Sequence, residues 1–161
     1  MSTSTVAQSN NSSLDPALAS RIVREGYGPG AWHGADLRAA IAGVEAATAF
    51  RRPAPGRHNI AEIVVHHAFY VRSAIERLGG SPDAFPFEGE DWFTLNDERA
   101  MSWSAVASLL DGLQSQLAEQ VAKPHGSSKT ADEQMDLVLG ITCHGIYHAG
   151  QIQLIKVLLA G

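Results

Sequence analysis

Two histidines, His144 and His148, lie four residues apart in the C-terminal segment. In a helix at about 100° per residue they point about 40° apart and stand about 6 Å apart along the axis, so both imidazoles can reach one ion. They fall in the middle of an apolar stripe that also carries Gln151. Imidazole is a ligand for zinc, nickel, copper and iron. The pattern predicts a metal site. The alternative is a pair of core histidines that each find a buried hydrogen-bond partner.

A two-histidine site needs further ligands, and an upstream helical segment offers the adjacent pair His66 and His67. Helical periodicity places His67 near the centre of that segment's apolar stripe and His66 at its edge, which favours His67 as the inward residue. Glu62 lies one turn before His66. It is either an acceptor for an imidazole N–H or a solvated residue of the helix.

The remaining histidines and the single cysteine are not expected to be metal ligands. His58 precedes a helix and lies more than two turns from His66, which favours a capping or packing role. His33 and His125 lie in turn sequences, where solvation is the default. Cys143 lies about 100° from the histidine stripe, which favours a small packing residue over a ligand or nucleophile.

Helical patterns surround these residues, and no segment alternates as a strand does. The expected helices run over 15–26, from Gly34 to before Pro53, over 59–78, over 103–121, and from a capping box at Thr130 and Glu133 almost to the C-terminus. A connection over 81–98 carries four aromatic residues and is expected to fold over the end of the domain. The predicted fold class is all-α, a four-helix bundle with an additional short N-terminal helix.

Composition limits the classes of function. The 161 residues are 45% hydrophobic and 18% charged, which suits one globular domain over 14–161 behind a Ser/Thr/Asn-rich tail over 1–13 that we expect to be disordered. The net charge of −5, with no basic cluster larger than two arginines, argues against nucleic acid as a partner. The tail does not resemble a signal peptide, and no segment predicts a membrane span. A single cysteine suits a reducing compartment, so we expect a cytoplasmic protein.

Two segments resemble the metal-binding motifs of the DinB/YfiT-like proteins: residues 58–70, HNIAEIVVHHAFY, and residues 144–152, HGIYHAGQI. In that family the first motif reads His-Ser-Ile-x-Glu-Leu-Val-x-His-x-Ala-x-Trp and the second reads His-x-x-x-His-x-x-Gln-Ile. Residues 31–34 and 89–92 are similar to one branch of the family. The resemblance, which covers most of the chain, implies a four-helix bundle that is commonly a homodimer.

The family register also implies the set of metal ligands. The family's ligand stands four residues after the motif Glu and two before the motif Ala, and both rules select His66. The resemblance therefore implies a triad of His66, His144 and His148, with His67 in reserve. Tyr70 stands where Trp is common in the family, which is expected to change packing rather than binding.

Three neutral imidazoles leave a divalent ion with uncompensated charge and at least one open position. Two enzymatic hypotheses follow: metal-dependent hydrolysis, and, by resemblance, transfer or isomerisation with a low-molecular-weight thiol such as bacillithiol or mycothiol. Gly145 follows His144, so the glutamate of the HExxH proteases is absent. The alternative is a non-catalytic, stress-related binding or dimerisation module with a structural metal. We expect one divalent ion per chain, nickel or zinc, and a small-molecule substrate.

Overall fold

The structure is a computed structural model that describes residues 14–123 and 129–161. Its helices are α1 (Pro16–Tyr27), α2 (Leu37–Ile41), α3 (Ala46–Ala49), α4 (Ile60–Arg77), α5 (Trp103–Ala122) and α6 (Ala131–Ala160). The described ranges contain no strand, so the predicted all-α class is confirmed. The predicted tail over 1–13 and His125 lie outside the described residues. None of the described helices is both long enough and apolar enough to cross a membrane.

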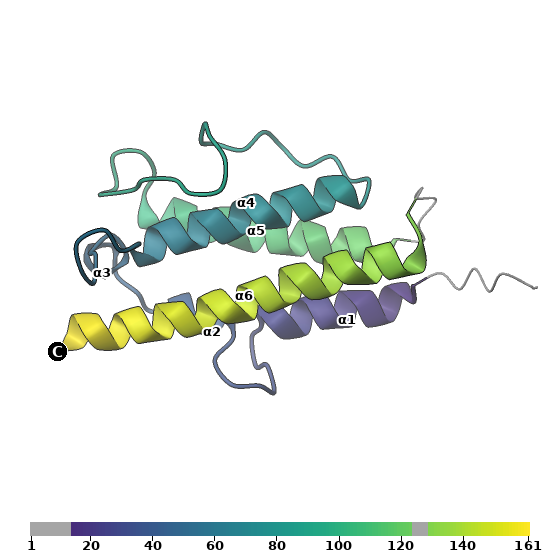
Figure 1. Ribbon diagram of the computed structural model, residues 1–161, viewed down its shortest axis with the longest axis horizontal. Coiled ribbons are helices and arrows are strands. Elements are labelled where there is room, and N and C mark those ends of the chain that lie inside the picture. The colour runs from purple at the N-terminus through teal and green to yellow at the C-terminus, as the bar shows by residue number, and fades with distance from the viewer. Residues whose placement is uncertain (1–13, 124–128) are drawn as a thin grey trace, which may run out of the picture.

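The four longest helices pack side by side along the molecule (Figure 1). Helices α4 and α5 run in the same direction, opposite to α1 and α6 (Figure 1). Because parallel neighbours cannot be joined by a short turn, the chain between α4 and α5 has to return along the length of the bundle. This topology explains why the long connection over 78–102 exists and why it lies beside α4 (Figure 1).

Side-chain caps set the starts of α4 and α6. The Asn59 side chain accepts a hydrogen bond from the backbone N–H of Glu62 at the start of α4. The predicted capping box is present at the start of α6, where Thr130 and Glu133 each accept from the other's backbone N–H. Each cap satisfies amides that would otherwise lack a partner in the first turn. These caps therefore set where α4 and α6, the two helices that carry the histidines, begin.

The expected single helix between Gly34 and Pro53 is instead two short helices, α2 and α3. The chain turns between them at Gly43, whose φ of 69° is a left-handed conformation that glycine adopts at little cost.

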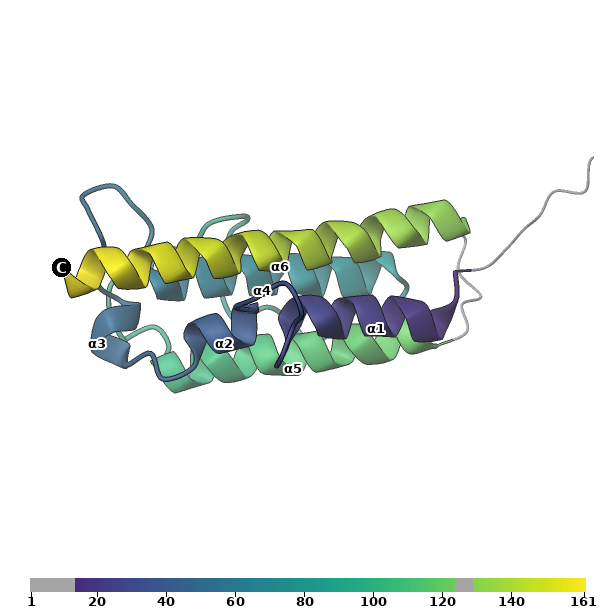
Figure 2. The same ribbon diagram turned by 90° about the horizontal axis from the view of Figure 1, so that it is seen from below.

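The N-terminal helix α1 is itself a member of the bundle, since it packs against α5 and α6. Helices α1 and α2 lie one after the other along the much longer α6 (Figure 2).

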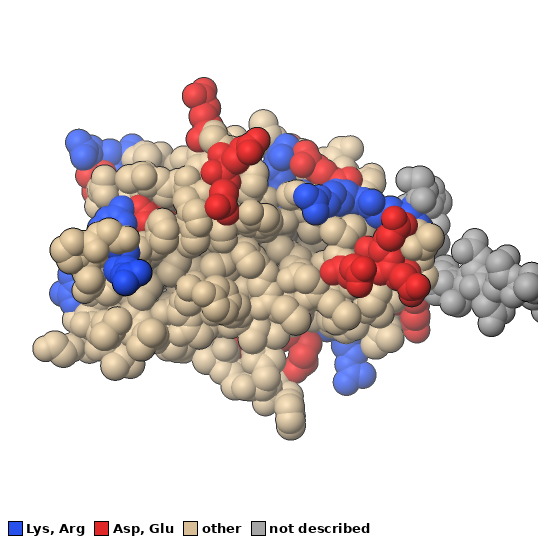
Figure 3. All heavy atoms as spheres, in the orientation of Figure 1, with Lys and Arg blue, Asp and Glu red and all other residues tan. Residues whose placement is uncertain are grey.

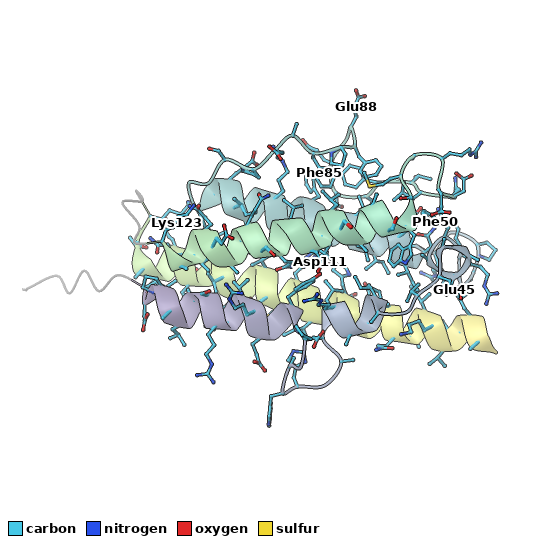
Figure 4. The ribbon with its side chains drawn as sticks, turned by 180° about the vertical axis from the view of Figure 1, so that it is seen from behind. Glu45, Phe50, Phe85, Glu88, Asp111 and Lys123 are labelled. Carbon is cyan, nitrogen blue, oxygen red and sulfur yellow. The ribbon has the colours of Figure 1, made fainter. Side chains whose placement is uncertain are left out.

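The aromatic residues of the connection anchor it to α4. Phe69 of α4 has its ring centroid 5.4 Å from that of Phe85 and 5.6 Å from that of Phe93. Figure 4 shows Phe85 on this connection, outside the helices. The connection therefore packs along the side of α4, and the expectation that it folds over the end of the domain is wrong. The reason is the parallel course of α4 and α5, which the helix patterns alone do not reveal.

Candidate metal centre

Three imidazoles meet between α4 and α6. Nε2 of His144 lies 3.2 Å from Nε2 of His66 and 3.0 Å from Nε2 of His148. One ligand atom from each ring lies within 4.8 Å of the other two. His66 and His148 are buried, and His144 is half-buried. The structure thus brings together the three histidines that the family register implies.

The outer nitrogens of two of these rings are held as donors. Nδ1 of His66 lies 2.7 Å from the backbone oxygen of Asp91, and Nδ1 of His148 lies 2.6 Å from Oε1 of Gln151. Because a carbonyl oxygen only accepts, each Nδ1 carries the hydrogen, and the neutral ring presents an unprotonated Nε2. Two lone pairs therefore face one point beside His144. This arrangement suits a cation at that point, so the residues present fit a metal ion.

Burial keeps the cluster uncharged. Desolvation lowers the pKa of His144 from 6.5 to about 4, and the nearby charge of a protonated His66 would lower it further. Desolvation lowers the pKa of His148 to about 4 as well, although the hydrogen bond that its Nδ1–H donates to Gln151 opposes this shift. The pKa of His66 is also below its ordinary value, chiefly through burial. Neutral imidazole is the form that binds a metal, so near pH 7 no ring has to lose a positive charge before an ion binds.

The connection between α4 and α5 holds His66 in place from outside the bundle. Asp91 has a φ of 68°, which is uncommon for a residue with a side chain, and its backbone oxygen accepts from His66. Its carboxylate accepts from the hydroxyl of Tyr70 at 3.0 Å. The Trp92 ring is stacked between two imidazoles, with centroids 3.7 Å from His58 and 3.9 Å from His66. Strained backbone at such a contact is typical of functional sites.

Sequence reasoning did not find Asp91. It noted the resemblance of residues 89–92 to one family branch but gave no residue there a role. Asp91 is 25 positions from His66 along the chain, and no helical or strand pattern links the two. The left-handed backbone of Asp91 leaves no clear mark in a single sequence, since aspartate is common in many turns. Only the path of the connection reveals this contact.

Glu62 is buried but does not contact the three histidines. Its carboxylate accepts hydrogen bonds from the guanidinium of Arg52, from Nδ1 of His58 at 2.9 Å and from the backbone N–H of Leu95 at 3.0 Å. Burial alone would raise the pKa of Glu62, but these hydrogen bonds hold it below the ordinary value. Glu62 is therefore not a solvated helix residue. It accepts from an imidazole, that of His58, and ties three segments together at the base of α4.

His67, the reserve ligand, lies directly behind the cluster. It is 1% exposed, and its Nδ1 lies 2.9 Å from Nδ1 of His144. Its Nε2 lies 3.0 Å from the amide nitrogen of Gln114. Both ring nitrogens thus have partners other than the point that the three Nε2 atoms share. The helical periodicity correctly predicted that the His67 side chain points into the bundle. It lies behind the three-histidine cluster, however, where it contacts Gln114 of α5.

Two further expectations have mixed outcomes. His33 is exposed, in keeping with a solvated turn residue. Cys143 is also exposed, so its expected packing role is wrong. The reason is that none of the described helices packs against this side of α6, which the helical wheel of one segment does not show.

An open cleft of about 440 Å³ lies beside His144. Its lining includes the polar side chains of Tyr70, Ser73, Arg77 and Asp136, and its apolar wall comes from α6. The cleft is large enough for a small molecule, and His144 forms part of its wall.

The chain belongs to the DinB superfamily, whose family model matches residues 31–152, more than half of the protein. The match contains α2 to α5, the connection with Asp91, and the part of α6 that carries His144 and His148. Comparisons with curated proteins and with solved structures gave no match.

Proposed function

We propose that the protein binds one divalent transition-metal ion, nickel or zinc, through Nε2 of His66, His144 and His148, and uses it in hydrolysis or in the transfer of a small thiol. The observation that carries this proposal is the convergence of the three Nε2 atoms while the outer nitrogens of His66 and His148 donate to oxygens. Such outer hydrogen bonds are the usual support of metal-binding imidazoles.

The number of ligands favours a catalytic over a structural metal. Structural zinc sites are usually closed by four protein ligands, whereas catalytic sites keep a position open. Among the described residues the cluster has three members, and the cleft beside His144 reaches it. These two features support an enzyme over the alternative of a non-catalytic binding or dimerisation module.

The chain's own residues would bind and orient a substrate in the cleft. A bound ion supplies Lewis acidity, which makes water or a thiol nucleophilic near neutral pH. Arg77 and Asp136 place opposite charges on the lining, and Tyr70 places a hydroxyl there. A polar small molecule with groups of both signs fits this lining better than a purely apolar one.

The first experiment measures metal content and affinity. Purified protein analysed by mass spectrometry of its metals should hold about one transition ion per chain. His144→Ala or His148→Ala should abolish tight Zn²⁺ and Ni²⁺ binding in titration calorimetry, because two imidazoles hold a divalent ion far less well than three. His33→Ala is the matched control, since His33 is exposed and outside the cluster. Full occupancy in the His144→Ala/His148→Ala double variant would remove the proposal.

The second experiment separates the two activities and the alternative. Metal-loaded protein is assayed for ester and amide hydrolysis and for adduct formation with low-molecular-weight thiols. We expect one of these activities, and its loss in His148→Ala. A protein that holds its metal and loses stability without it, but shows neither activity, would be the structural module instead. The expected small-molecule substrate, the homodimer and the cytoplasmic location remain predictions.

A further inference from the structure

A second layer of side chains lies behind the histidine cluster and is hydrogen-bonded to it through His144. Gln114 of α5 is 7% exposed, and its amide nitrogen lies 3.0 Å from Nε2 of His67. Nδ1 of His67 lies 2.9 Å from Nδ1 of His144, whose Nε2 faces the cluster. The order of contact is therefore Gln114, His67, His144 and then the shared point. Along this line each nitrogen of His67 has one partner, whereas Nε2 of His144 faces two, the Nε2 atoms of His66 and His148.

The position of one hydrogen determines the position of the next along this line. In the structure the Gln114 amide N–H donates to Nε2 of His67, so a neutral His67 carries its hydrogen on Nδ1. That hydrogen points to Nδ1 of His144, which must accept it. A neutral His144 then carries its own hydrogen on Nε2. This hydrogen points into the cluster, toward the unprotonated Nε2 atoms of His66 and His148.

This first pattern of hydrogens satisfies the cluster without an ion, but it blocks His144 as a ligand. A ligand nitrogen must present a lone pair, so Nε2 of His144 has to lose its hydrogen and Nδ1 has to carry it. Nδ1 of His67 must then accept, and Nε2 of His67 must donate. A donor at that position needs an oxygen in front of it. The Gln114 amide offers one when it turns over and exchanges its nitrogen and oxygen.

We propose that His67 and Gln114 are positioning residues that select the tautomer of His144 and so switch the cluster between a closed, ion-free pattern and an ion-binding pattern. The inference rests on the proposed metal site. The protons balance in three transfers: His144 Nε2 gives up one hydrogen to solvent, the hydrogen between the two Nδ1 atoms passes from His67 to His144, and His67 Nε2 gains one hydrogen from solvent. All four rings therefore stay neutral. Glutamine suits this place because its amide can donate or accept, whereas a carboxylate only accepts.

The helix packing supports this role for His67. Gly145 of α6 faces the His67 ring, and a Cβ at Gly145 would lie 3.1 Å from Nε2 of His67. The absence of a side chain there gives the imidazole room to reach both neighbours. A histidine that merely filled the core would need no such space and no polar partner on each ring nitrogen.

The first test uses substitutions with opposite expected signs. Gln114→Glu should raise the affinity for Zn²⁺ roughly tenfold, because a carboxylate holds the hydrogen on Nε2 of His67 and fixes the ion-binding pattern. Gln114→Met should lower the affinity, since it can neither donate nor accept in the same way. Gln116→Glu adds the same charge at an exposed position of α5 and should change little. Equal losses in Gln114→Glu and Gln114→Met would indicate a purely structural role and overturn the proposal.

Two substitutions of His67 test whether a hydrogen-bond acceptor at this position restores the Zn²⁺ affinity that is lost without one. His67→Phe keeps a ring but removes both nitrogens, and should lower Zn²⁺ affinity by roughly 10- to 100-fold. His67→Asn places an amide oxygen near the position of Nδ1, where it accepts from His144, and should recover most of the loss. Circular dichroism of each variant checks that the helices are intact. A folded His67→Phe variant with unchanged affinity would contradict the proposal.

The second test observes the tautomers directly in the unmodified protein. Long-range ¹H–¹⁵N spectra of the imidazoles are recorded before and after Zn²⁺ is added. We expect hydrogen on Nδ1 of His67 and Nε2 of His144 without the ion, and the reverse with it. If Zn²⁺ shifts His66 and His148 while His67 keeps its first tautomer, this inference fails and the metal site stands. If Zn²⁺ shifts none of the four rings, the proposed function fails and this inference with it.

Discussion

At the scale of single residues, the chemistry of the cluster comes from which nitrogen of each ring is occupied. Asp91 and Gln151 take the outer nitrogens of His66 and His148, and His67 takes that of His144. A histidine in solution exchanges freely between its two tautomers, whereas these contacts determine which nitrogen of each ring carries the hydrogen. The same burial that makes the contacts strong also disfavours protonation. The hydrogen-bond partners and the burial of the individual histidines therefore determine both the charge of the cluster and which nitrogens present a lone pair to an ion.

The pKa values of His144 and His148 predict the pH at which metal affinity begins to fall. Sequence reasoning predicts that affinity falls as pH drops through the ordinary histidine pKa of about 6.5. Because the pKa values of His144 and His148 are about 4, we expect Zn²⁺ affinity to stay nearly constant from neutral pH to about pH 5 and to fall near pH 4. Titration calorimetry at a series of pH values measures this. A steep loss centred near pH 6.5 would contradict the burial argument.

The stability of the metal-free protein should depend on pH in the same range. Below about pH 6.5 the unfolded chain binds protons at His144 and His148, but the folded protein binds them only near pH 4. The contribution of these two imidazoles to the free energy of unfolding is therefore fully present above pH 6.5, falls as the pH drops toward 4, and levels off below. We expect about 2 kcal/mol for each imidazole after solvent screening is allowed for. Urea titrations of the protein and of His148→Gln, in which the slope should flatten, check this.

At the scale of elements, the site depends on how the connection over 78–102 and helix α6 meet α4. Stacking of Trp92 between His58 and His66 attaches the connection to the start of α4. Gly145 lets α6 approach α4 at the level of His67. Trp92 covers the histidine cluster from outside the bundle, and the lack of a side chain at Gly145 leaves space for the His67 ring behind the cluster. Each can be tested with a control of the same residue type.

Removal of the Trp92 ring should loosen the outer cover. We expect Trp92→Ala to cost about 1–2 kcal/mol of stability, because two stacked contacts are lost. Zn²⁺ affinity should fall several-fold, since His66 loses one of its supports. Trp32→Ala is the control, because Trp32 is 95% exposed, and we expect it to change stability by less than about 0.5 kcal/mol. Equal effects of the two substitutions in chemical denaturation would contradict this account of the connection.

A methyl group at Gly145 should displace His67. The Cβ in Gly145→Ala would lie 3.1 Å from Nε2 of His67, so the ring must move, at a cost of about 1–3 kcal/mol. Gly150→Ala in the same helix meets nothing within 4 Å and should instead stabilise the protein by about 0.5–1 kcal/mol. Thermal unfolding of both variants measures the difference. Stabilisation by Gly145→Ala would show that His67 has more room than the packing suggests.

At the scale of the whole molecule, one side of α6 is apolar and uncovered. Figure 3 shows a broad area without charged side chains over α6, with acidic side chains gathered near the end where this helix begins. The exposed apolar side chains of α6 are Leu139, Tyr147, Leu154, Val157 and Leu158. On the opposite side of the molecule Asp111 of α5 points toward α1 (Figure 4), where it accepts from Tyr27.

The homodimer that the family resemblance implies would bury this apolar face of α6. Sedimentation equilibrium should then give twice the chain mass of 17.1 kDa. Leu154→Glu places a charge in the middle of the face and should shift the protein toward the monomer. Leu18→Glu is the control, because Leu18 is 46% exposed but lies on α1. A monomeric parent protein at micromolar concentration would contradict the prediction.

Local signals in the sequence determined the four long helices and the pairing of His144 with His148. The capping box at Thr130 and Glu133 and the one-turn spacing act over a few residues, and the structure keeps both. A periodic apolar stripe likewise needs only its own helix to be recognised. These features depend on contacts between near neighbours, so a single sequence contains them.

Tertiary structure decided the different places of His66 and His67. Both side chains are buried, at 5% and 1% exposed, so burial does not separate them. Their partners do, because α6 and the connection with Asp91 meet His66, while Gln114 of α5 lies beyond His67. Those partners are 25 to 78 positions away in the chain. Helical periodicity gives a side chain's direction from its own axis, but the helix that lies in that direction is set by the packing of the whole bundle.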